Sequence, residues 1–489
     1  MMSMGVRERS LLRLVPKVDD LLRRPEIAPL LDAHPRAFVL DAITAALERL
    51  RREIREGKLD GETIRSRVEE GIGLEVVGEV GRAARRGLRR VVNATGVVLH
   101  TGLGRAPLAP EAARAAAEAL AGYCLLEVDA ETGRRGKREA FLADLLVRLL
   151  GAEAATVVNN NAGATLLALA ALAEGTEVIV SRGELVEIGG AFRMPDVMRR
   201  SGCDLVEVGT TNRTYLEDYR RALGERTGAL LKVHRSNFRI EGFVHEVEIE
   251  DLAALGREKG IPVIHDLGSG LVFGTGLEAL GGEPLVRPSV QSGADLVTFS
   301  GDKLFGGPQA GVIVGRSPAV ERVRAHPLFR ALRLDKGTLA ALETTVRIHL
   351  AGEDAARERI PVLRMLSAPI GDLDRRARSM ADRLAGLRLE GVAVAVEEDV
   401  SRAGSGSAPE MPIPTRVVTL RVRDPGPDAF LAWLREHDPP VFARIREDRV
   451  VLDPRTLLPG DEEIVADAVA NAAKRGGEES RWRSDGRRD

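Results

Sequence analysis

The chain of 489 residues is poor in cysteine and in aromatic side chains. Its two cysteines, Cys124 and Cys203, are too few for a disulfide scaffold and fit a reducing cytosol. The net charge of -2 excludes a global electrostatic attraction to nucleic acid. With 44% hydrophobic and 29% charged residues, the composition is that of a soluble globular protein long enough for two or three domains.

Long hydrophobic runs and targeting signals are also missing. No run reaches the roughly 18 to 20 apolar residues of a membrane span. The first residues, MMSMGVRERSLLRLVPK, contain neither a sustained apolar stretch nor a small-residue cleavage site. We therefore expect a cytoplasmic protein without a membrane partner.

Several common ligand motifs fail on spacing. The stretch GSGLVFG at 268–274 is one residue off the dinucleotide fingerprint, and TGRRGKRE at 132–139 is not a P-loop. The eight histidines show no H-E-x-x-H pair or other metal spacing, so no metal site is expected.

The first domain, residues 1–88, is predicted to be helical. DAITAALERLRREIREGKLDG at 41–61 has helical spacing and is predicted to end at Gly61. Residues 1–90 hold 19 Lys and Arg against 15 Asp and Glu, a net +4. The densest part of this weak basic bias is RAARRGLRR at 82–90, an arginine run that, on charge alone, is better explained as a solvated face or hinge than as a binding site.

A second domain, 89–345, alternates short β-branched runs with helical patterns, which predicts an α/β fold with a mostly parallel sheet. The predicted strands are 155–160, 176–181, 229–234, 261–266 and 295–300. Polar residues follow them, and ligands of such sheets bind at the carboxyl ends of the strands. One active site at this edge is therefore expected.

The remaining chain is predicted to form a small α+β domain at 346–475 and a disordered tail at 476–489. A Gly, Ser and Pro-rich break lies at 401–414. It is followed by the strand RVVTLRV, the helix DAFLAWLREH, the strands FARIRED and RVVLD, and the helix DEEIVADAVANAAK.

A lysine and an aspartate at two strand ends indicate pyridoxal phosphate (PLP), which needs a Schiff-base lysine and a carboxylate for its ring nitrogen. Lys303 in SGDKLFGG and Asp266 in IPVIHD can take these roles, 37 residues apart. Taken singly, Lys303 is better explained as a surface lysine and Asp266 as a helix cap. Their order and their places at strand ends favour the cofactor.

A phosphate cradle is predicted in VVNNNAGATLLAL, where backbone N–H groups and the helix dipole favour an anion. Its members are Asn160, Asn161, Ala162, Gly163 and Ala164, with Ser300 as a further phosphate ligand. A simple asparagine turn is the alternative. His265, beside Asp266, and His234 are the histidines we expect near the cofactor.

Six blocks of the sequence carry a family resemblance: VVNATGVVLHTGLGRAPL (91–108), VVNNNAGATLLAL (157–169), SRGELVEIGGAFRMPDVMRRSGCDLVEVGTTNRTYLEDY (181–219), KVHRSNFRIEGF (232–243), HDLGSG (265–270) and SGDKLFGGPQAG (300–311). Together they resemble bacterial selenocysteine synthase, the L-seryl-tRNA(Sec) selenium transferase family. The resemblance covers about residues 1–475. It implies the fold-type-I PLP architecture, with Lys303 as the Schiff-base lysine and Asp266 as the ring-nitrogen partner.

The resemblance also implies that arginines line the selenium-donor site, at positions corresponding to Arg105, Arg330 and Arg333. Without it, Arg330 and Arg333 would be interpreted as an exposed salt-bridging face, since they are three residues apart on a helix-like stretch. Gly102 departs from the family, which more often has Asn there.

The function implied is PLP-dependent conversion of seryl-tRNA(Sec) to selenocysteinyl-tRNA(Sec) through a dehydroalanyl-tRNA intermediate, with selenophosphate as donor. The family's N-terminal domain binds the tRNA, and its members form homo-oligomers, decamers of five dimers. Two alternatives stay open: a PLP-dependent lyase or β-replacement enzyme acting on a free small substrate, and an RNA-binding protein with a decayed PLP site.

Overall fold

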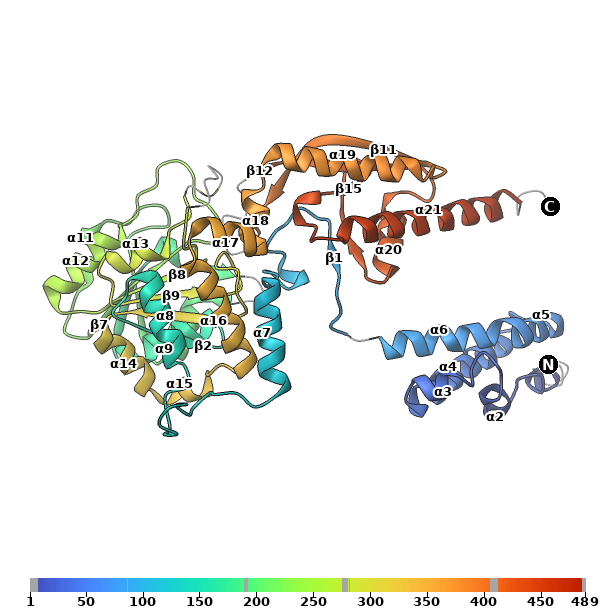
Figure 1. Ribbon diagram of the computed structural model, residues 1–489, viewed down its shortest axis with the longest axis horizontal. Coiled ribbons are helices and arrows are strands. Elements are labelled where there is room, and N and C mark those ends of the chain that lie inside the picture. Colours follow the sequence, from blue (N-terminus) through green and yellow to red (C-terminus); the bar gives the residue numbers. More distant parts are fainter. Residues whose placement is uncertain are drawn as a thin grey trace. The chain divides into compact units, whose positions relative to one another are not determined.

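The chain divides into two units, Met1–Arg90 and Val91–Asp489, which are described separately. The computed structural model describes residues 8–85, 87–188, 192–274, 280, 282–404 and 412–485 (Figure 1).

The first unit is helical. Its helices are α2 (Val18–Leu22), α3 (Leu30–Ala33), α4 (Arg36–Arg55), α5 (Gly61–Ser66), a π-helical turn (Arg67–Gly71) and α6 (Ile72–Ala84). The long helix α4 buries a stripe at spacings of three and four, which packs against α6 and consists of Val39, Ile43, Leu47, Leu50 and Ile54. An amphipathic stripe of this kind explains why a short helical unit has a core.

The predicted end of the helix at Gly61 is wrong, because α4 stops at Arg55. Gly57 then takes a φ of +70°, which glycine adopts readily. The side chain of Asp60 accepts a hydrogen bond from the Thr63 N–H at 2.8 Å and so caps the start of α5. Gly61 therefore begins a helix instead of ending one.

A seven-stranded sheet forms the centre of the second unit, in the order β2-β10-β9-β8-β7-β3-β6. Only β10 runs antiparallel to its neighbours. The strands are β2 (Ala154–Val158), β3 (Glu177–Ser181), β6 (Asp204–Val208), β7 (Thr227–Val233), β8 (Val263–Gly268), β9 (Leu296–Ser300) and β10 (Gly311–Gly315). The five predicted strands are confirmed; β6 and β10 were not predicted.

Helices cover both faces of this sheet (Figure 1). One face packs on α8 (Ala140–Leu150), α12 (Ile249–Lys259) and α16 (Lys336–Leu350), and the other on α9 (Asn161–Ala173), α10 (Met194–Arg200) and α14 (Ser317–Ala325). On β7, Leu230 joins the first core, and Ala229 and Leu231 join the second. This alternation is the strand period of two, and it confirms the predicted α/β class.

The connecting helices of this region are α7 (Pro110–Ala121), α11 (Leu216–Ala222), α13 (Val286–Gln291), α15 (Pro327–Ala331), α17 (Glu353–Arg359) and α18 (Pro361–Ser367). Short strands β4 (Glu187–Ile188) and β5 (Phe192–Arg193) pair with each other.

The C-terminal part forms a four-stranded antiparallel sheet in the order β11-β12-β15-β14. Its strands are β11 (Val392–Arg402), β12 (Pro412–Val422), β14 (Arg444–Arg446) and β15 (Arg449–Leu452). Helices α19 (Ile370–Gly386), α20 (Pro427–Glu436) and α21 (Asp461–Asp485) share its core. A parallel pair, β1 (Val92–Asn93) with β13 (Val441–Phe442), joins the start of the second unit to this part.

The segment 476–485, expected to be disordered, differs from the prediction because α21 continues to Asp485. At Gly476 a side chain would meet the Trp433 ring at 3.4 Å, so the helix is still packed on α20 where the tail was expected to begin. Residues 486–489 lie outside the described residues.

Within the described ranges, no helix combines the length and the apolar character that crossing a bilayer requires. The same residues contain no group of three or more His, Cys, Asp or Glu placed to hold a metal ion.

Candidate active site

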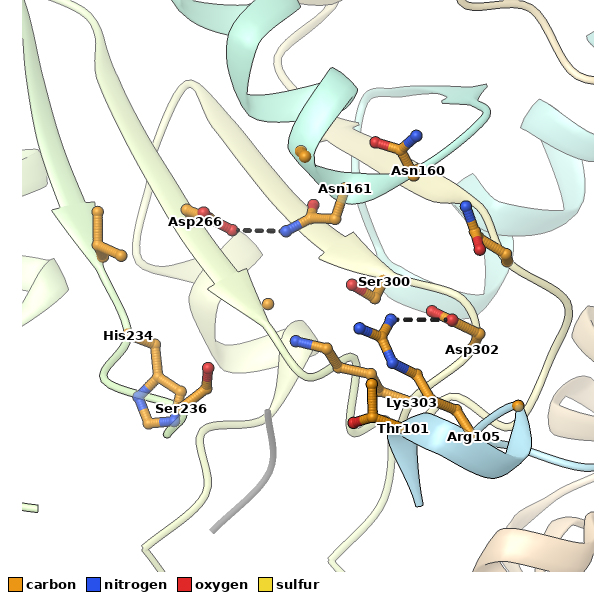
Figure 2. Close-up of a pocket in the computed structure, with 15 residues that line it drawn as sticks. Thr101, Arg105, Asn160, Asn161, His234, Ser236, Asp266, Ser300, Asp302 and Lys303 are labelled. Carbon is orange, nitrogen blue, oxygen red and sulfur yellow. Dashed lines mark hydrogen bonds and ion pairs between the residues drawn. The ribbon is translucent and has the colours of Figure 1, made fainter. Parts of the chain in front are cut away.

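A cavity of about 450 Å³ opens at the carboxyl ends of β7, β8 and β9 (Figure 2). The start of α9 and the loop after β1 complete it. Its lining residues are Thr101, Gly104, Arg105, Asn160, Asn161, Ala162, Val233, His234, Ser236, Asp266, Gly268, Ser300, Asp302, Lys303 and Gln309. The cavity therefore forms at the edge where strand ends were expected to meet.

Asp266 projects from β8 into this cavity and is 7% exposed. Its Oδ1 atom accepts hydrogen bonds from the side chains of Asn161 at 2.8 Å and Thr298 at 3.2 Å. Burial raises the pKa of the Asp266 carboxyl, and the Asn161 hydrogen bond and the Lys303 charge oppose that rise. A buried carboxylate held in this way is stabilised by a cationic partner such as a protonated ring nitrogen.

Lys303 lies in the loop after β9 and is 5% exposed. Burial lowers the pKa of the Lys303 amine, against the attraction of Asp266. A lowered pKa increases the fraction of neutral amine, which is the nucleophilic form. A Cβ at Gly268 would stand 3.9 Å from the Lys303 Nζ atom, so glycine leaves space beside the amine.

The lysine loop is fixed by hydrogen bonds on both sides of Lys303. The Gly301 N–H donates to the Ala310 carbonyl at 2.8 Å, and the Leu304 N–H donates to the Ser269 carbonyl at 3.0 Å. The buried His349 ring contacts the Phe305 carbonyl at 2.9 Å. The glycines and the proline of this loop therefore shape a rigid turn that presents one amine to the cavity.

The start of α9 lies where the phosphate cradle was predicted. Asn160 is its N-cap, and the side-chain oxygen accepts from the Gly163 N–H at 2.8 Å. Asn160, Asn161 and Ala162 line the cavity, but Gly163 and Ala164 do not. The N–H groups of Gly163 and Ala164 already bond to Asn160. Asn161 reaches Asp266 through its side chain, a contact that the sequence did not predict.

Ser300, at the end of β9, lines the cavity as expected. The neighbouring strand β10 passes very close to the cradle. A Cβ on Gly311 would come within 2.2 Å of the Asn160 carbonyl oxygen. Glycine is therefore required at this position for β10 to lie beside the start of α9.

Arg105 also reaches the cavity, where its Nη1 atom lies 3.0 Å from Asp302 Oδ2 (Figure 2). Its φ of +61° is a left-handed conformation that a non-glycine residue adopts at a cost.

The other two predicted arginines, Arg330 and Arg333, are exposed and line a separate cavity of about 430 Å³. Within one described chain, the structure does not bring them to Lys303. Their neighbours in that cavity include the ion pairs Arg138–Glu127 at 3.0 Å and Arg324–Glu321 at 2.7 Å.

The two predicted histidines lie in different places. His234 lines the cavity just after β7, and its Nε2 atom is 3.4 Å from Glu283 Oε1. His265 is buried and does not line the cavity, because strand alternation turns it away when Asp266 faces inward. Burial lowers the pKa of His265 to about 3, so its ring is neutral.

The sequence prediction missed several cavity residues. Asp302 stands next to Lys303 in SGDKLFGG, and Ser236 follows His234 by two positions, so adjacency was the signal for both. Thr101, Gly104, Val233, Gly268 and Gln309 were also missed. Their signal was weak because residues of these types are as common in structural turns as in binding sites.

Comparison with known proteins adds family information to this geometry. The family model described as L-seryl-tRNA selenium transferase matches residues 91–458, and the one described as selenocysteine synthase N terminal matches residues 12–51. The chain belongs to the L-seryl-tRNA selenium transferase family. The resemblance expected from the sequence blocks is thereby confirmed.

Relatives of this family match nearly end to end. The L-seryl-tRNA(Sec) selenium transferase of Solidesulfovibrio magneticus is 48% identical over 469 residues, covering 95% of this chain and 99% of the relative. The protein of that name from Geobacter sulfurreducens is 48% identical over 459 residues, covering 94% and 98%.

The solved structure of D-glucosaminate-6-phosphate ammonia-lyase is similar in fold, with a TM-score of 0.56 and 22% identity. The match covers 80% of this chain and 97% of the other. The fold is the predicted fold-type-I architecture of PLP-dependent enzymes, with a mostly parallel central sheet and a helical N-terminal region.

Proposed function

We propose that this chain is a PLP-dependent L-seryl-tRNA(Sec) selenium transferase, which converts seryl-tRNA(Sec) to selenocysteinyl-tRNA(Sec) with selenophosphate as donor. The observation that carries the proposal is the pairing of Lys303 and Asp266 in one buried cavity, within a chain that its family matches nearly end to end. Both side chains are less than 10% exposed, and buried charged groups in a cavity are typical of a catalytic site.

The donor set of the cavity fits PLP. Lys303 would hold the aldehyde carbon, Asp266 the ring nitrogen, and Ser300 with the start of α9 the phosphate. Asn161 supports this assignment because its side chain orients Asp266, while its Oδ1 atom is buried without a partner among the described residues. When bound, PLP supplies an electron sink for the pair left at Cα after proton removal.

The residues of the chain then divide the work. Lys303 Nζ, once free, removes the Cα proton of the seryl group, because its lowered pKa makes the neutral amine available. The rigid loop around it fixes the direction of the amine. Asn161 and Thr298 hold Asp266 in place for its charged partner.

Arg105 is assigned to the selenium donor, since selenophosphate is an anion and a guanidinium fork matches phosphate-type oxygens. We assign Arg330 and Arg333 to the same donor. Their separate cavity in this chain means that they would serve the site of a neighbouring copy. That arrangement agrees with the homo-oligomer, a decamer of five dimers, that the family resemblance implies.

Residues 1–88 are proposed to bind the tRNA by shape and backbone contacts, because the segment is helical, modestly basic and poor in aromatic residues for base stacking. The working division is then 1–88 for tRNA, 89–345 for PLP and 346–475 for the small domain, in a cytoplasmic enzyme. Removing residues 1–88 should leave PLP bound while seryl-tRNA(Sec) affinity falls and its salt dependence becomes shallower. Unchanged tRNA binding by the folded truncation would contradict this role.

The proposal is tested by incubating the enzyme and selenophosphate with seryl-tRNA(Sec), seryl-tRNA(Ser) or free serine. We expect selenocysteinyl product from seryl-tRNA(Sec) alone. Product from free serine would instead favour the small-substrate lyase or β-replacement enzyme. An absorbance band of the bound coenzyme excludes the decayed RNA-binding protein, and its absence would support that alternative.

A further inference from the structure

A buried histidine–carboxylate pair lies at the edge of the main cavity, outside the roles assigned above. His234 Nε2 and Glu283 Oε1 are 3.4 Å apart, and their side chains are 22% and 2% exposed. Both atoms are buried, and neither makes a hydrogen bond in the described part of the chain, so each is the nearest charged or polar group that could satisfy the other. An isolated buried carboxylate is costly, so these two groups stabilise each other.

The backbone fixes His234 in this position. Its N–H donates to the Asp266 carbonyl at 2.9 Å, and its own carbonyl accepts from the Ser236 N–H at 3.0 Å. Figure 2 shows the His234 ring and the Ser236 hydroxyl on the side of the cavity toward which the Lys303 amine points. The histidine is therefore tied to the strand end that carries Asp266.

Glu283 settles which ring nitrogen is available. A carboxylate that faces Nε2 favours a hydrogen on that nitrogen and orients the ring, as carboxylate partners of histidine do elsewhere. Nδ1 is then the nitrogen left for a group inside the cavity. Glu283 is also close enough to Lys303 to favour its charged form. It acts on the chemistry through His234, as a positioning residue.

We infer that His234 is the acid that protonates the leaving β-hydroxyl of the seryl group, held in position by Glu283. This inference rests on the proposed function. Hydroxide is a poor leaving group at neutral pH, so breaking the Cβ–O bond needs a proton donor. Lys303 is occupied with the Cα proton, and Asp266 is buried against Asn161 and Thr298.

Lys303 Nζ takes the Cα proton, and the electron pair of that bond becomes the second bond between Cα and Cβ. The Cβ–O bond breaks, and the oxygen leaves with its electron pair. The oxygen takes the proton from His234 Nδ1 and departs as water, which leaves His234 neutral and Lys303 protonated.

The test compares two leaving groups on the full-length enzyme with bound PLP. One tRNA(Sec) is charged with serine, and the other with β-chloroalanine, whose chloride leaves without a proton. Single-turnover elimination is measured without selenium donor. We expect His234→Gln to slow the seryl reaction about 100-fold or more, and the chloroalanyl reaction less than about threefold.

Glu283→Gln should show the same leaving-group dependence with a smaller loss, about tenfold in kcat with little change in KM, and Glu283→Asp should restore part of it. His437→Gln in the small domain and Glu258→Gln on α12 are matched controls outside the cavity. The coenzyme absorbance and the unfolding midpoint of each variant report whether it folds and binds PLP.

Equal slowing of both leaving groups in His234→Gln would overturn the inference, because His234 would then hold the coenzyme or the substrate. No slowing of either would overturn it as well. If His234→Gln does not fold, the variants His234→Asn, Glu283→Gln and Glu283→Asp decide the question. For each of them, the slowing of the seryl reaction is compared with the slowing of the chloroalanyl reaction. A wild-type enzyme that acts on neither charged tRNA would overturn the proposed function itself, a result distinct from any failure confined to the variants.

Discussion

Two cavities of the second unit, the one around Lys303 and the one around Arg330 and Arg333, hold their charged side chains in opposite ways. In the first, Lys303 and Asp266 are buried. Burial lowers the pKa of the Lys303 amine and raises the pKa of the Asp266 carboxyl, so it favours the neutral form of each group. In the second, Arg330 and Arg333 are exposed beside surface ion pairs.

This difference separates two kinds of work. Proton transfer needs groups whose charge can change near neutral pH, and burial provides that change. Holding an anion needs groups whose charge does not change with pH near neutrality, and an arginine side chain stays charged there whether it is exposed or buried. We therefore assign proton transfer to the first cavity, and the binding of the anionic donor to Arg105 together with Arg330 and Arg333 of a neighbouring copy.

The largest expected effect follows from Lys303→Ala, which removes the chemistry of the first cavity. Turnover of seryl-tRNA(Sec) should fall by about 10³-fold or more, since the variant loses both the anchor and the base. Single-turnover loss of the seryl hydroxyl is the measurement. Retention of more than a tenth of the wild-type rate would remove Lys303 from its role. Lys259→Ala, at the exposed end of α12 and outside both cavities, is the matched control.

Asp266→Asn should keep some bound PLP and lose most turnover, because an amide does not hold the ring nitrogen protonated. The substitution also predicts a change in stability without coenzyme. The folded pKa of Asp266 is raised, so its contribution to stability falls as pH rises from the unfolded value through the folded one. Above that window, coenzyme-free Asp266→Asn should unfold at a higher temperature than wild type, and an unchanged or lower midpoint would contradict the burial argument.

Arg330→Ala and Arg333→Ala should each weaken use of the donor about ten- to a hundredfold, the loss of one charge-assisted contact of about 1.5 to 3 kcal/mol. The dehydroalanyl product should still form on the tRNA when the donor is absent. Substitution by lysine should restore only part of the use of the donor, because lysine keeps the charge but lacks the forked guanidinium group. If these variants also fail to form the dehydroalanyl product, the assignment of Arg330 and Arg333 to the donor is wrong.

Mixing two impaired variants sharpens this comparison. If the arginines serve a neighbouring copy, oligomers assembled from Lys303→Ala chains and Arg330→Ala, Arg333→Ala chains should recover part of the activity. The recovery is measured as selenocysteinyl-tRNA(Sec) formed after joint refolding, with each variant alone as the control. No recovery in verified mixed oligomers would place the arginines and the lysine in separate functions.

The smallest effect on turnover is expected for His265→Gln, since His265 faces away from the first cavity. Its folded pKa is about 3, below the ordinary value of 6.5, so the unfolded chain binds a proton that the folded chain refuses. Wild-type stability should therefore fall as pH drops from about 6.5 toward 3. The variant should show a shallower fall in unfolding midpoint over that window, and an identical profile would contradict the burial of a neutral ring.

Much of the first cavity could be predicted from the sequence, because parallel strands bring their carboxyl ends to one edge. Lys303, Asp266, Asn160, Asn161 and Ser300 each follow a strand that the pattern identified. The Asn161–Asp266 hydrogen bond joins positions 105 residues apart, and strand patterns contain no information on such contacts.

Other predictions failed or remained open for related reasons. Strand β10 follows a glycine-rich loop, and GVIVG is too short to distinguish from a turn. The end of α4 was misplaced because both Gly57 and Gly61 could stop a helix, and only the cap at Asp60 decides between them. The placement of Arg330 and Arg333 depends on Leu328, Phe329 and Leu332, which pack against a core built from distant parts of the chain, and local spacing does not encode that packing.

Borohydride reduction of the PLP-bound enzyme, followed by peptide mapping, tests the central claim most directly. The account predicts one reduced adduct, on the peptide that contains Lys303. Lys232, which pairs with Glu184 at 3.2 Å and whose side chain is 12% exposed, is the contrasting lysine of the same sheet. An adduct on Lys232, or an enzyme that binds PLP without any reducible adduct, would contradict the account.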